Sequence, residues 1–521
     1  MLRVGWSERG LLTSVSVLHD IIGQAGVDPH QPAVVDLDRK LSYSELIDEV
    51  SRVGAGLRSR GVHEGDRVAL LFPNSVDFIV AALASSWVGA IFVPLAVTDP
   101  PSRLSKIVVD CSPTLIATSE LRPLSFSDVP ALSIGDLLEG EAPIGALEAG
   151  ARASYIIYTS GTTGTPKGVK IGATAFAAAV HSTVLALGLT RATRTLCVSP
   201  FHFDGSYDNL FPTLTSGGTI VIRPRESLLF PRTFFNTVAK ERINYAGFTP
   251  SYLRLLLSSP QFSNLKDSPL ETVALGGEAL TVADVRAVWS HLPDLRVFNR
   301  YGPTETTIAV TNFELTPDMI AKETVPIGRP HPGVTFVLVG DDGKVIDAAN
   351  KSGELYIGGV QRMDGYWGEP ELTRSVMRED IVPGETLYRT GDLVYWNDDG
   401  NYVYVDRVDR VVKRSGVRIS IVELGESLSK INEITAAACV TFDRDGELGI
   451  AAFVSSEAVF SVLDIRRAAL HMIPENMLPD TFVFVSEMPL GRSNMLDEAR
   501  LLSDAGLRPF RSTSTPPRAP A

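Results

Sequence analysis

The stretch Tyr158–Val169, which reads YTSGTTGTPKGV, most constrains what this chain can fold into. An apolar run, Tyr155–Tyr158, leads into it and predicts a buried strand. Glycines let backbone N–H groups approach an anion closely, and the hydroxyls add further donors. Lys167 adds a positive charge on a long stem, which suits a phosphate oxygen. The stretch therefore predicts a phosphate-binding loop, and the alternative is a polar surface turn.

This loop differs from the nucleotide-binding loop of P-loop NTPases. In that motif a glycine precedes the lysine and a serine or threonine follows it. Here Pro166 precedes Lys167 and Gly168 follows it. The sequence therefore indicates another class of phosphate-binding protein.

The composition is that of a large globular protein. The chain has 521 residues, which is enough for two or more domains. Hydrophobic residues make up 44% of it and charged residues 21%, as in ordinary globular proteins. A net charge of −13 at pH 7 argues against nucleic acid or an anionic membrane as the partner. Cys111, Cys197 and Cys439 are widely spaced and predict neither a disulfide framework nor a zinc site. We therefore expect a protein of the reducing cytoplasm.

The N-terminal residues lack a signal-peptide pattern. The most membrane-like segment, Val76–Val97, contains Asp77 and is interrupted by Gly89 and Pro94. A buried helix from about Ser75, followed by a short strand at Ala90–Val93, explains this segment better than a bilayer crossing.

Helix and strand patterns alternate up to the loop. Ser42 and Glu45 have the spacing of a capping box and predict a helix that continues to Gly61. A buried strand is predicted at Asp66–Leu71, and a further helix at Ala173–Leu187 beyond the loop. This alternation predicts α/β layers built on parallel sheets.

Three later strands end in small or polar residues. These ends are Phe201–Tyr207, Val273–Ala279 and Val297–Thr307. Together with the loop, they predict a binding site along one edge of a sheet. The segment Val325–Gly400 indicates short β-strands, and the Pro-, Ser- and Arg-rich end Arg511–Ala521 is predicted to be disordered.

The loop closely resembles that of the adenylate-forming superfamily, as do YGPTE at Tyr301–Glu305 and YRTGD at Tyr388–Asp392. This superfamily includes adenylation domains of nonribosomal peptide synthetases, acyl- and aryl-CoA ligases and firefly luciferase. The resemblance covers nearly the whole chain and implies an α/β fold. It implies a large domain at residues 1–408, made of two α/β subdomains and a β-subdomain. A small mobile α+β domain at 409–510 and a disordered tail at 511–521 would follow.

The resemblance implies that the chain joins a carboxylate to the α-phosphate of ATP and expels pyrophosphate, with Mg²⁺ as cofactor. Glu305 would hold Mg²⁺, Thr304 would bind the α-phosphate, and Lys167, with His202 beside the carboxylate site, would complete the catalytic set. The other nucleotide-binding residues would be Thr159, Ser160, Gly161, Thr162, Thr163, Gly164, Gly276, Gly277, Glu278, Asn299, Tyr301, Gly302, Asp392 and Arg407. Taken alone, YGPTE is also compatible with an ordinary helix start.

Asp392 would accept hydrogen bonds from both ribose hydroxyls, although a TGD sequence is also typical of a turn. Arg407 and Asp409 fit the hinge pattern G-R-x-D of the superfamily, with Asp406 in place of its glycine. Asp409 would be the pivot about which the small domain rotates. The alternative is a solvated charge in an alternating Asp/Arg run.

The substrate pocket has a motif of its own. Phe203–Ser206 matches the F-D-x-S of amino-acid-activating members, in which the aspartate binds the α-ammonium group of the substrate. Asp204 takes that place here, and the alternative is an N-cap for the helix that begins near Tyr207. By family spacing, the other pocket residues would be Gly205, Asp208, Gly247, Val273, Leu275, Arg300, Ile308 and Ala309. Two acids and an arginine suggest a small or polar amino acid, a β-amino acid or a cyclic imino acid.

One position departs from the superfamily. Its members end in a motif close to L-P-x-T-x-N-G-K, whose lysine contacts the substrate carboxylate and the α-phosphate. Here Met495 stands in the place of that lysine, and Arg492 is the nearest cation.

The interpretation we favour is a free-standing adenylation enzyme that transfers an aminoacyl group to the phosphopantetheine thiol of a separate carrier protein. One alternative is an acyl-CoA or amide ligase of the same fold. Another is a degenerate member that binds nucleotide or a carrier protein but turns over poorly, which Met495 alone favours.

Overall fold

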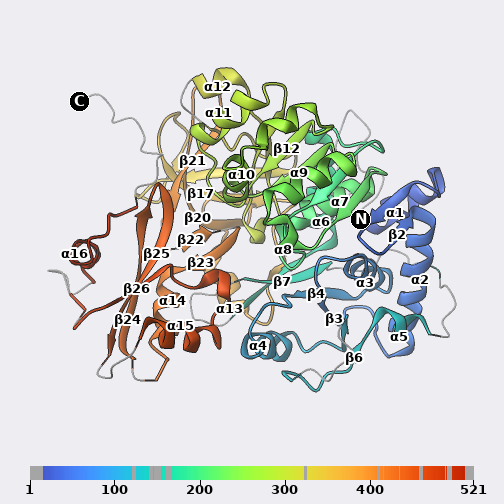
Figure 1. Cartoon of the computed structure of the whole chain (residues 1–521), viewed down its shortest axis with the longest axis horizontal. Helices are drawn as coiled ribbons and strands as arrows, with labels where there is room; N and C mark the ends of the chain where they lie inside the picture. The colour runs from blue at the N-terminus through green and yellow to red at the C-terminus, as the bar shows by residue number, and fades with distance from the viewer. Residues whose placement is uncertain are drawn as a thin grey trace.

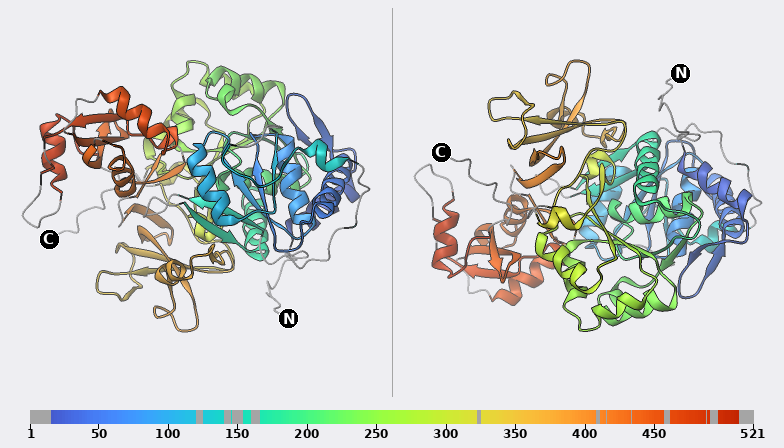
Figure 2. Two further views of the ribbon diagram at one scale, coloured as in Figure 1. Left: turned by 90° about the horizontal axis from the view of Figure 1, so that it is seen from below. Right: turned by 90° about the horizontal axis from the view of Figure 1, so that it is seen from above.

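The computed structural model describes residues 16–119, 125–139, 145, 154–159, 166–321, 325–407, 411–414, 416–432, 434–456, 461–486, 488–489 and 496–510 (Figure 1). Two sheets with their helices form most of the large N-terminal part. A third sheet follows them, and a smaller C-terminal part lies beside the rest of the molecule (Figure 2). The mixed α/β class predicted from the alternation of patterns is confirmed.

The first sheet carries the two strands that flank the predicted phosphate loop. Its seven strands follow the order β18-β8-β7-β4-β3-β5-β6, and β3 to β7 pair in parallel. Strands β7 and β8 form an antiparallel hairpin, so the loop joins two neighbouring strands. The strand bounds are β3 Arg67–Leu71, β4 Ile91–Leu95, β5 Leu115–Thr118, β6 Ala131–Leu132, β7 Tyr155–Thr159, β8 Lys167–Ile171 and β18 Gly365–Tyr366.

The second sheet carries the other predicted site motifs. Its eight strands follow the order β14-β13-β12-β11-β9-β10-β1-β2, with parallel pairing throughout except at the two outer strands. Its bounds are β1 Pro32–Val35, β2 Lys40–Ser42, β9 Arg194–Cys197, β10 Thr219–Ile222, β11 Tyr245–Phe248, β12 Thr272–Leu275, β13 Arg296–Tyr301 and β14 Thr311–Glu314. Because parallel strands end at one edge, β11, β12 and β13 bring their following loops together.

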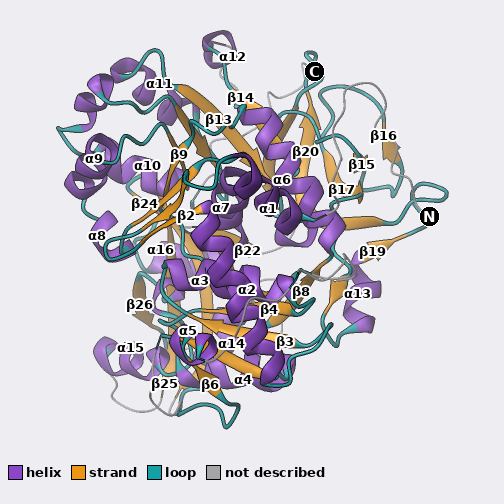
Figure 3. Ribbon diagram, turned by 90° about the vertical axis from the view of Figure 1, so that its right-hand side faces the viewer, coloured by secondary structure: helices purple, strands orange, loops and turns teal. Residues whose placement is uncertain are grey.

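Helices cover both sheets and form the main core. Figure 3 shows α2, α3, α6 and α7 running through the middle of the molecule, and one buried apolar cluster joins these helices to strands of both sheets. The helices are α1 Val17–Val27, α2 Tyr43–Ser59, α3 Val76–Trp87, α4 Pro101–Cys111, α5 Ile134–Leu138, α6 Ala173–Leu187, α7 Tyr207–Thr215, α8 Arg225–Leu228, α9 Pro231–Lys240, α10 Pro250–Leu257, α11 Val282–His291 and α12 Pro317–Ala321.

Local signals in the sequence set several helix starts. Ser42 and Glu45 form the predicted capping box at α2, because each side chain bonds the backbone N–H of the other. Ser75 caps α3, and β4 follows at Ile91–Leu95, so the buried helix and strand predicted for the apolar segment are confirmed. Among the residues that the structure describes, no helix is long and apolar enough to cross a membrane. The three cysteines are free and buried.

The β-rich segment forms a third sheet. Its strands are β15 Val334–Val339, β16 Val345–Ile346, β17 Gly353–Gly359, β19 Met377–Arg378, β20 Leu387–Trp396 and β21 Tyr402–Arg407, and the short helix α13 Pro370–Val376 precedes β19. Pairing of neighbours is antiparallel throughout. The alternative of a turn at Asp392 is wrong, because this residue lies inside β20.

The C-terminal part has its own core. It begins with the hairpin β22 Val411–Arg414 and β23 Val417–Ser420, and its three-stranded sheet consists of β24 Ile434–Arg444, β25 Glu447–Ser456 and β26 Thr481–Phe484. The helices α14 Ile421–Leu428, α15 Val462–Leu470 and α16 Glu498–Asp504 accompany the sheet. The predicted boundary at 408/409 and the tail 511–521 lie outside the described residues.

Candidate active site

The residues at the two described ends of the predicted phosphate loop lie opposite each other on the neighbouring strands β7 and β8. Thr159 closes β7 and pairs directly with Lys167, which opens β8. The predicted loop residues Ser160, Gly161, Thr162, Thr163 and Gly164 lie outside the described residues. The phosphate-binding role of this stretch therefore stays a prediction.

Asp204 lies in a single 3₁₀ turn, Asp204–Ser206, that runs into α7. The alternative of an N-cap is wrong, because Ser206 is the N-cap of α7 and no side chain caps this helix. The Oδ2 atom of Asp204 is shielded from solvent and has no hydrogen-bond partner in the described chain. Such a carboxylate oxygen calls for a donor from a ligand.

Burial raises the pKa of the Asp204 carboxyl to about 6, and the negative charge of Glu305 adds to this shift. A hydrogen bond from the Thr304 side chain, the backbone of Gly205 and the charge of Lys413 act in the opposite direction. Two of the predicted catalytic residues, Thr304 and Glu305, are therefore close neighbours of the predicted substrate-binding aspartate.

Thr304 and Glu305 follow β13 in a second 3₁₀ turn, Thr304–Thr306. The alternative of an ordinary helix start is wrong, because Thr307 ends this turn with a φ of 61°. The Glu305 side chain is 2% exposed and accepts a hydrogen bond of 2.9 Å from the Tyr366 hydroxyl. This bond fixes the direction in which the carboxylate points.

A single oriented carboxylate fits Mg²⁺ that arrives bound to a nucleotide, because substrate phosphates and water supply the remaining oxygen ligands. In the described ranges, no group of three or more His, Cys, Asp or Glu side chains is placed to hold a metal ion. Glu305 is thus the described residue that fits a nucleotide-bound magnesium ion.

Asp392, Arg407 and Tyr301 form a buried triad on three strands. The Nη1 atom of Arg407 donates to Oδ1 of Asp392 at 2.7 Å, and the Tyr301 hydroxyl donates to Oδ2 at 2.5 Å. The backbone N–H of Asp392 donates to the Thr390 hydroxyl at 2.9 Å. The predicted ribose-binding carboxylate is therefore held in one orientation by two predicted nucleotide-binding neighbours.

The remaining predicted nucleotide-binding residues line the ends of β12 and β13. Glu278 accepts a hydrogen bond of 2.9 Å from the backbone N–H of Ser251. Asn299 is buried and donates to the carbonyl of Pro326 at 2.8 Å. Gly276, Gly277 and Gly302 lie in the turns beside them, where a Cβ on Gly302 would come within 2.5 Å of the Ile308 carbonyl oxygen.

The hairpin β22–β23 reaches this edge from the C-terminal part. The backbone N–H of Gly416 donates to Oε1 of Glu278 at 3.2 Å. Lys413 Nζ lies 6.0 Å from the centre of the Tyr301 ring, within reach of a cation–π interaction. The predicted pivot Asp409, Met495 and Arg492 lie outside the described residues.

His202 stands beside Phe203, with ring centres 4.3 Å apart. Burial lowers its pKa to about 3, and the charges of Arg225 and Arg103 lower it further. The imidazole is therefore neutral at physiological pH and cannot supply a positive charge to the predicted carboxylate site.

Asp208 and Arg300 of the predicted pocket form a buried ion pair, with Nη1 3.1 Å from Oδ2. Thr183 donates to the other carboxylate oxygen of Asp208 at 2.6 Å. Arg300 also donates to the Tyr245 hydroxyl, which in turn donates to Oδ1 of Asn209 at 2.9 Å. Thr183, Tyr245 and Asn209 belong to no motif, so no local pattern pointed to them.

The structure separates two predicted pocket residues from the rest. Val273 and Leu275 pack into the apolar cluster with α9, α10 and α11. Ala274 pairs with Gly247, and side chains alternate along a strand, so Val273 and Leu275 occupy the opposite face of β12. A Cβ on Gly276 would come within 2.9 Å of the Arg300 Cβ. Ala274 and Gly276 therefore share the face of Gly247 and Arg300.

Ile308 and Ala309 lie in a loop with left-handed backbone, since φ is 61° at Thr307 and 68° at Ile308. Gln361 Nε2 donates to the carbonyls of Thr307 and Ala309 at 3.3 and 2.7 Å. Gln361 Oε1 lies 2.9 Å from Nδ1 of His331, a buried histidine whose pKa burial lowers. Gln361 and His331, which the sequence did not single out, thus fix this wall of the pocket.

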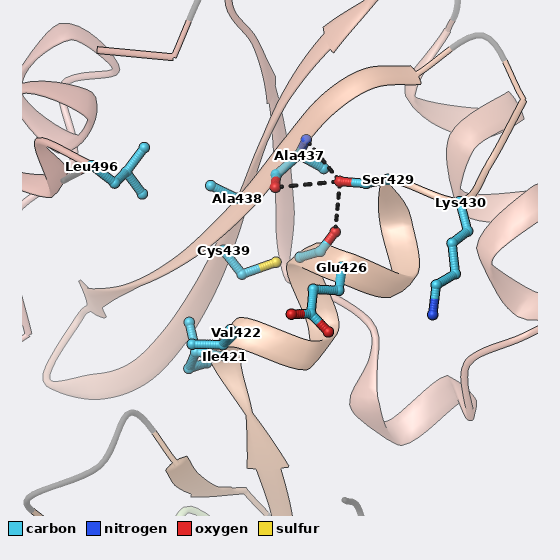
Figure 4. Close-up of a pocket in the computed structure, with 10 residues that line it drawn as sticks. Ile421, Val422, Glu426, Ser429, Lys430, Ala437, Ala438, Cys439 and Leu496 are labelled. Carbon is cyan, nitrogen blue, oxygen red and sulfur yellow. Dashed lines mark hydrogen bonds between the residues drawn. The ribbon is translucent and has the colours of Figure 1, made fainter. Parts of the chain in front are cut away.

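A hollow of about 490 Å³ lies elsewhere, on the C-terminal part between α14 and β24 (Figure 4). Its lining includes the apolar side chains of Ile421, Val422 and Leu496. Two charged residues also line it, Glu426 within α14 and Lys430 just after the end of that helix. None of the predicted site residues lines it. The chemistry of the strand ends, and not this hollow, marks the candidate active site.

Comparisons with known proteins agree with this assignment. A family model described as AMP-binding enzyme matches residues 23–367. Bacitracin synthase 3 of Bacillus licheniformis is 32% identical over 497 residues, which are 92% of this chain and 8% of that protein. D-alanine–D-alanyl carrier protein ligase of Bacillus licheniformis is 28% identical over 510 residues, which are 94% of this chain and 99% of that protein. The chain thus spans only a small part of the length of the bacitracin synthase.

Solved structures share the fold. The crystal structure of IdnL1 has a TM-score of 0.80 and 26% identity, with 91% of this chain and 99% of that chain covered. PA1221, a nonribosomal peptide synthetase protein containing adenylation and peptidyl carrier protein domains, has a TM-score of 0.84 and 24% identity. The alignment covers 94% of this chain and 84% of PA1221.

The fold and the site together define an adenylate-forming ligase. The chain belongs to the AMP-binding enzyme family. The resemblance stated from the motifs is confirmed.

Proposed function

We propose that this enzyme uses ATP and Mg²⁺ to activate an amino acid as its aminoacyl adenylate. It then transfers the aminoacyl group to the phosphopantetheine thiol of a separate carrier protein in the cytoplasm. The single observation that carries the choice of an amino acid is the buried, unpartnered Oδ2 of Asp204. An ammonium group would supply both the missing donor and the missing charge.

The described residues divide the work of adenylation. Asp392, Tyr301 and Arg407 would hold the ribose, while Thr304 would donate to the α-phosphate. Mg²⁺, held by Glu305, would neutralise charge on the phosphates. Because Thr304 also hydrogen-bonds Asp204, the substrate carboxylate would arrive next to the α-phosphate when its ammonium group binds Asp204.

Transfer to a carrier protein is supported by relatives. The similar D-alanine–D-alanyl carrier protein ligase is matched over nearly its whole length. In PA1221 an adenylation domain and a carrier domain share one chain. A thiol on a separate protein is therefore the acceptor that we propose for the second step.

Pyrophosphate exchange tests the proposed activation. The enzyme is assayed with a panel of amino acids and of matched acids that lack the amino group, and Asp204→Ala is compared with the wild type. Breaking a buried ion pair on one side costs about 3–5 kcal/mol, so apparent affinity for the amino acid should fall over a hundredfold. A preference for the acid that lacks the amino group would exclude amino acid activation.

Loading tests the proposed acceptor. Radiolabelled amino acid is offered with ATP to phosphopantetheinylated carrier protein and, separately, to coenzyme A. Label on the carrier protein is the expected result. Label on coenzyme A alone would instead identify an acyl-CoA ligase of the same family.

A further inference from the structure

An ion pair between Asp208 and Arg300, whose opposite charges cancel, forms the far wall of the candidate substrate pocket. Asp208 is 2% exposed and Arg300 is 8% exposed, and their charged groups lie 3.1 Å apart. Thr183 and Tyr245 supply further hydrogen bonds to the pair. One negative charge, that of Asp204, is therefore left for the ammonium group of a ligand, and the wall beyond it is polar but carries no net charge.

Unpartnered polar atoms gather at this wall. Tyr155 OH, Tyr207 OH, Asp208 Oδ2 and Arg300 Nε are all buried and make no hydrogen bond within the described chain, although Asp208 Oδ2 keeps its ion-pair contact. The rings of Tyr155 and Tyr207 are 5.2 Å apart, and the charges of Asp204 and Asp208 both act on the Tyr155 hydroxyl. Buried polar groups of native proteins are nearly always paired, so these atoms call for a ligand with donors and acceptors.

The space beyond Asp204 is short. Arg300 and Asn209 fill the region in front of Gly247, where an added Cβ would lie 2.1 Å from Asn209 Oδ1 and 3.0 Å from Arg300 Nη1. Near Gly205, by contrast, an added Cβ would meet nothing within 4 Å. Because Gly205 is exposed, the side of Asp204 and Gly205 is open to solvent, whereas the ion pair closes the buried end.

The pocket cannot lengthen by moving its third wall. Gln361 clamps the carbonyls of Thr307 and Ala309, and His331 holds Gln361. A chain of hydrogen bonds continues from His331 through Asn312 and Thr183 to Asp208. The loop and the ion pair are thus parts of one connected polar network, which resists local rearrangement.

From these observations we propose that the substrate is a compact amino acid whose side chain is uncharged and carries a hydroxyl or carboxamide group. This inference rests on the proposed function and specifies its substrate class. A neutral side chain with a donor and an acceptor satisfies the orphan atoms of Tyr155, Tyr207, Asp208 and Arg300 without disturbing the ion pair.

Other side chains fit this wall poorly. A cationic side chain competes with Arg300 for Asp208, and an anionic one competes with Asp208 for Arg300, so each leaves one buried charge uncompensated. An apolar side chain leaves these four buried polar atoms without a hydrogen-bond partner. Sites that are built to hydrogen-bond a substrate hydroxyl discriminate strongly against the analogue that lacks it.

Isosteric pairs of amino acids test the proposal in pyrophosphate exchange. The pairs are threonine with valine, serine with 2-aminobutyrate and asparagine with leucine, and ornithine and glutamate provide charged side chains. We expect kcat/KM for the hydroxyl or carboxamide member to exceed that of its apolar isostere at least tenfold in one or more pairs. Displacement of a fluorescent adenylate by threonyl- and valyl-sulfamoyl adenosine gives the same ranking without relying on turnover.

The double variant Asp208→Leu/Arg300→Met tests whether the ion pair sets this ranking, because it replaces both charges together and leaves neither unpaired. We expect its preference to shift at least tenfold toward the apolar isostere in the displacement assay. Arg223→Met is the matched control, since it removes one of the two arginine partners of Glu241, and none of these residues belongs to the predicted site. Its substrate ranking should equal that of the wild type.

The outcomes separate this inference from the proposed function. Brisk exchange with valine, leucine, ornithine or glutamate as the best substrate overturns the inference and leaves amino acid activation standing. A double variant that folds with an unchanged ranking also overturns it. If no amino acid supports exchange and no adenylate mimic displaces the fluorescent adenylate, both the inference and the proposed function are overturned.

Discussion

Arg407 and Asp392 lie directly opposite each other on the neighbouring strands β21 and β20, and their side chains form a buried ion pair of 2.7 Å. The two side chains are 5% and 1% exposed. Tyr301 donates to the second oxygen of Asp392, so the carboxylate has a fixed orientation toward the edge where we expect the ribose. The cross-strand register therefore prepares this part of the proposed nucleotide site before any ligand arrives.

Arg407→Met should remove that preparation. One buried carboxylate would lose its partner, which costs about 3–5 kcal/mol in stability. Affinity for MgATP should fall as well, because Asp392 can turn away from the ribose. Urea unfolding and calorimetric titration with MgATP measure the two effects. Arg389→Met, which breaks an exposed pair with Glu354 on the same sheet, should change neither by much. An Arg407→Met protein with normal affinity for MgATP would contradict the assigned role of the pair.

Asp204→Asn should stabilise the ligand-free enzyme while it weakens the binding of substrate. Burial raises the pKa of this carboxyl from 3.8 to about 6 in the folded chain. The folded state therefore favours the protonated form, and stability from this group is complete below about pH 4 and is lost as the pH rises through about 6. Above that range the asparagine variant should be more stable by about 3 kcal/mol.

Urea unfolding of both proteins at about pH 4 and about pH 7.5 measures this difference. The two free energies of unfolding should converge at the lower pH. Asp342→Asn, an exposed change, serves as the control for effects of net charge. A variant that is less stable than the wild type at the higher pH would show that Asp204 is compensated within the protein and does not wait for an ammonium group.

Local signals predicted much of the fold. The capping box at Ser42, the start of α3 after Ser75 and the helix α6 at Ala173–Leu187 all depend on residues close together in the sequence. The same holds for the placing of the motifs at strand ends, because an apolar run followed by glycines marks the end of a buried strand. The prediction that the phosphate loop and the later strand ends share one edge of a sheet is wrong, because the loop joins β7 and β8 of the first sheet, whereas β12 and β13 belong to the second.

The pocket shows where this approach fails. Val273 and Leu275 were predicted to line it, but a shift of one residue along a strand exchanges its two faces, and the structure turns Ala274 and Gly276 toward Arg300. The Asp208–Arg300 pair joins α7 to β13, and Gln361 reaches its loop across 52 residues. Such contacts depend on tertiary packing, which no local pattern contains.

Gly416→Ala should weaken the docking of the hairpin β22–β23 on the large part of the chain. Gly416 has a φ of 78°, which disfavours side chains, and an added Cβ would come within 3.1 Å of Thr249 Cγ2. The hydrogen bond from its N–H to Glu278 would be strained as a result. This arrangement brings the hairpin to the candidate site, and we predict that it serves the transfer step.

Transfer of a supplied aminoacyl adenylate to the carrier protein should therefore fall at least fivefold, whereas pyrophosphate exchange should not fall. Gly446→Ala provides the control, because this glycine has a φ of 88° but an added Cβ there meets nothing within 4 Å. A loss confined to exchange would mean that this arrangement serves adenylation instead.

Met495→Lys should accelerate adenylation and leave transfer nearly unchanged. Met495 stands where the superfamily has a lysine that contacts the substrate carboxylate and the α-phosphate. Loss of one preorganised donor to a developing charge typically costs about 10²–10³ in rate. Mg²⁺ at Glu305, together with Lys167 and Thr304, would still act on the phosphates, so the wild type should retain slow exchange.

The prediction requires exchange to rise at least tenfold in Met495→Lys while transfer from a supplied aminoacyl adenylate stays within about twofold of the wild type. Arg492→Met in the wild-type background asks whether the nearest cation in this segment substitutes for the lysine. Its planar guanidinium at another position of the sequence would approach the phosphate differently from a lysine at 495, so only a small loss is expected. Lys413 approaches the Tyr301 ring from the hairpin and is a second cation near the site. Fast exchange in the wild type, unchanged in Met495→Lys and abolished in Lys413→Met, would transfer the role to Lys413 and refute the assignment of position 495.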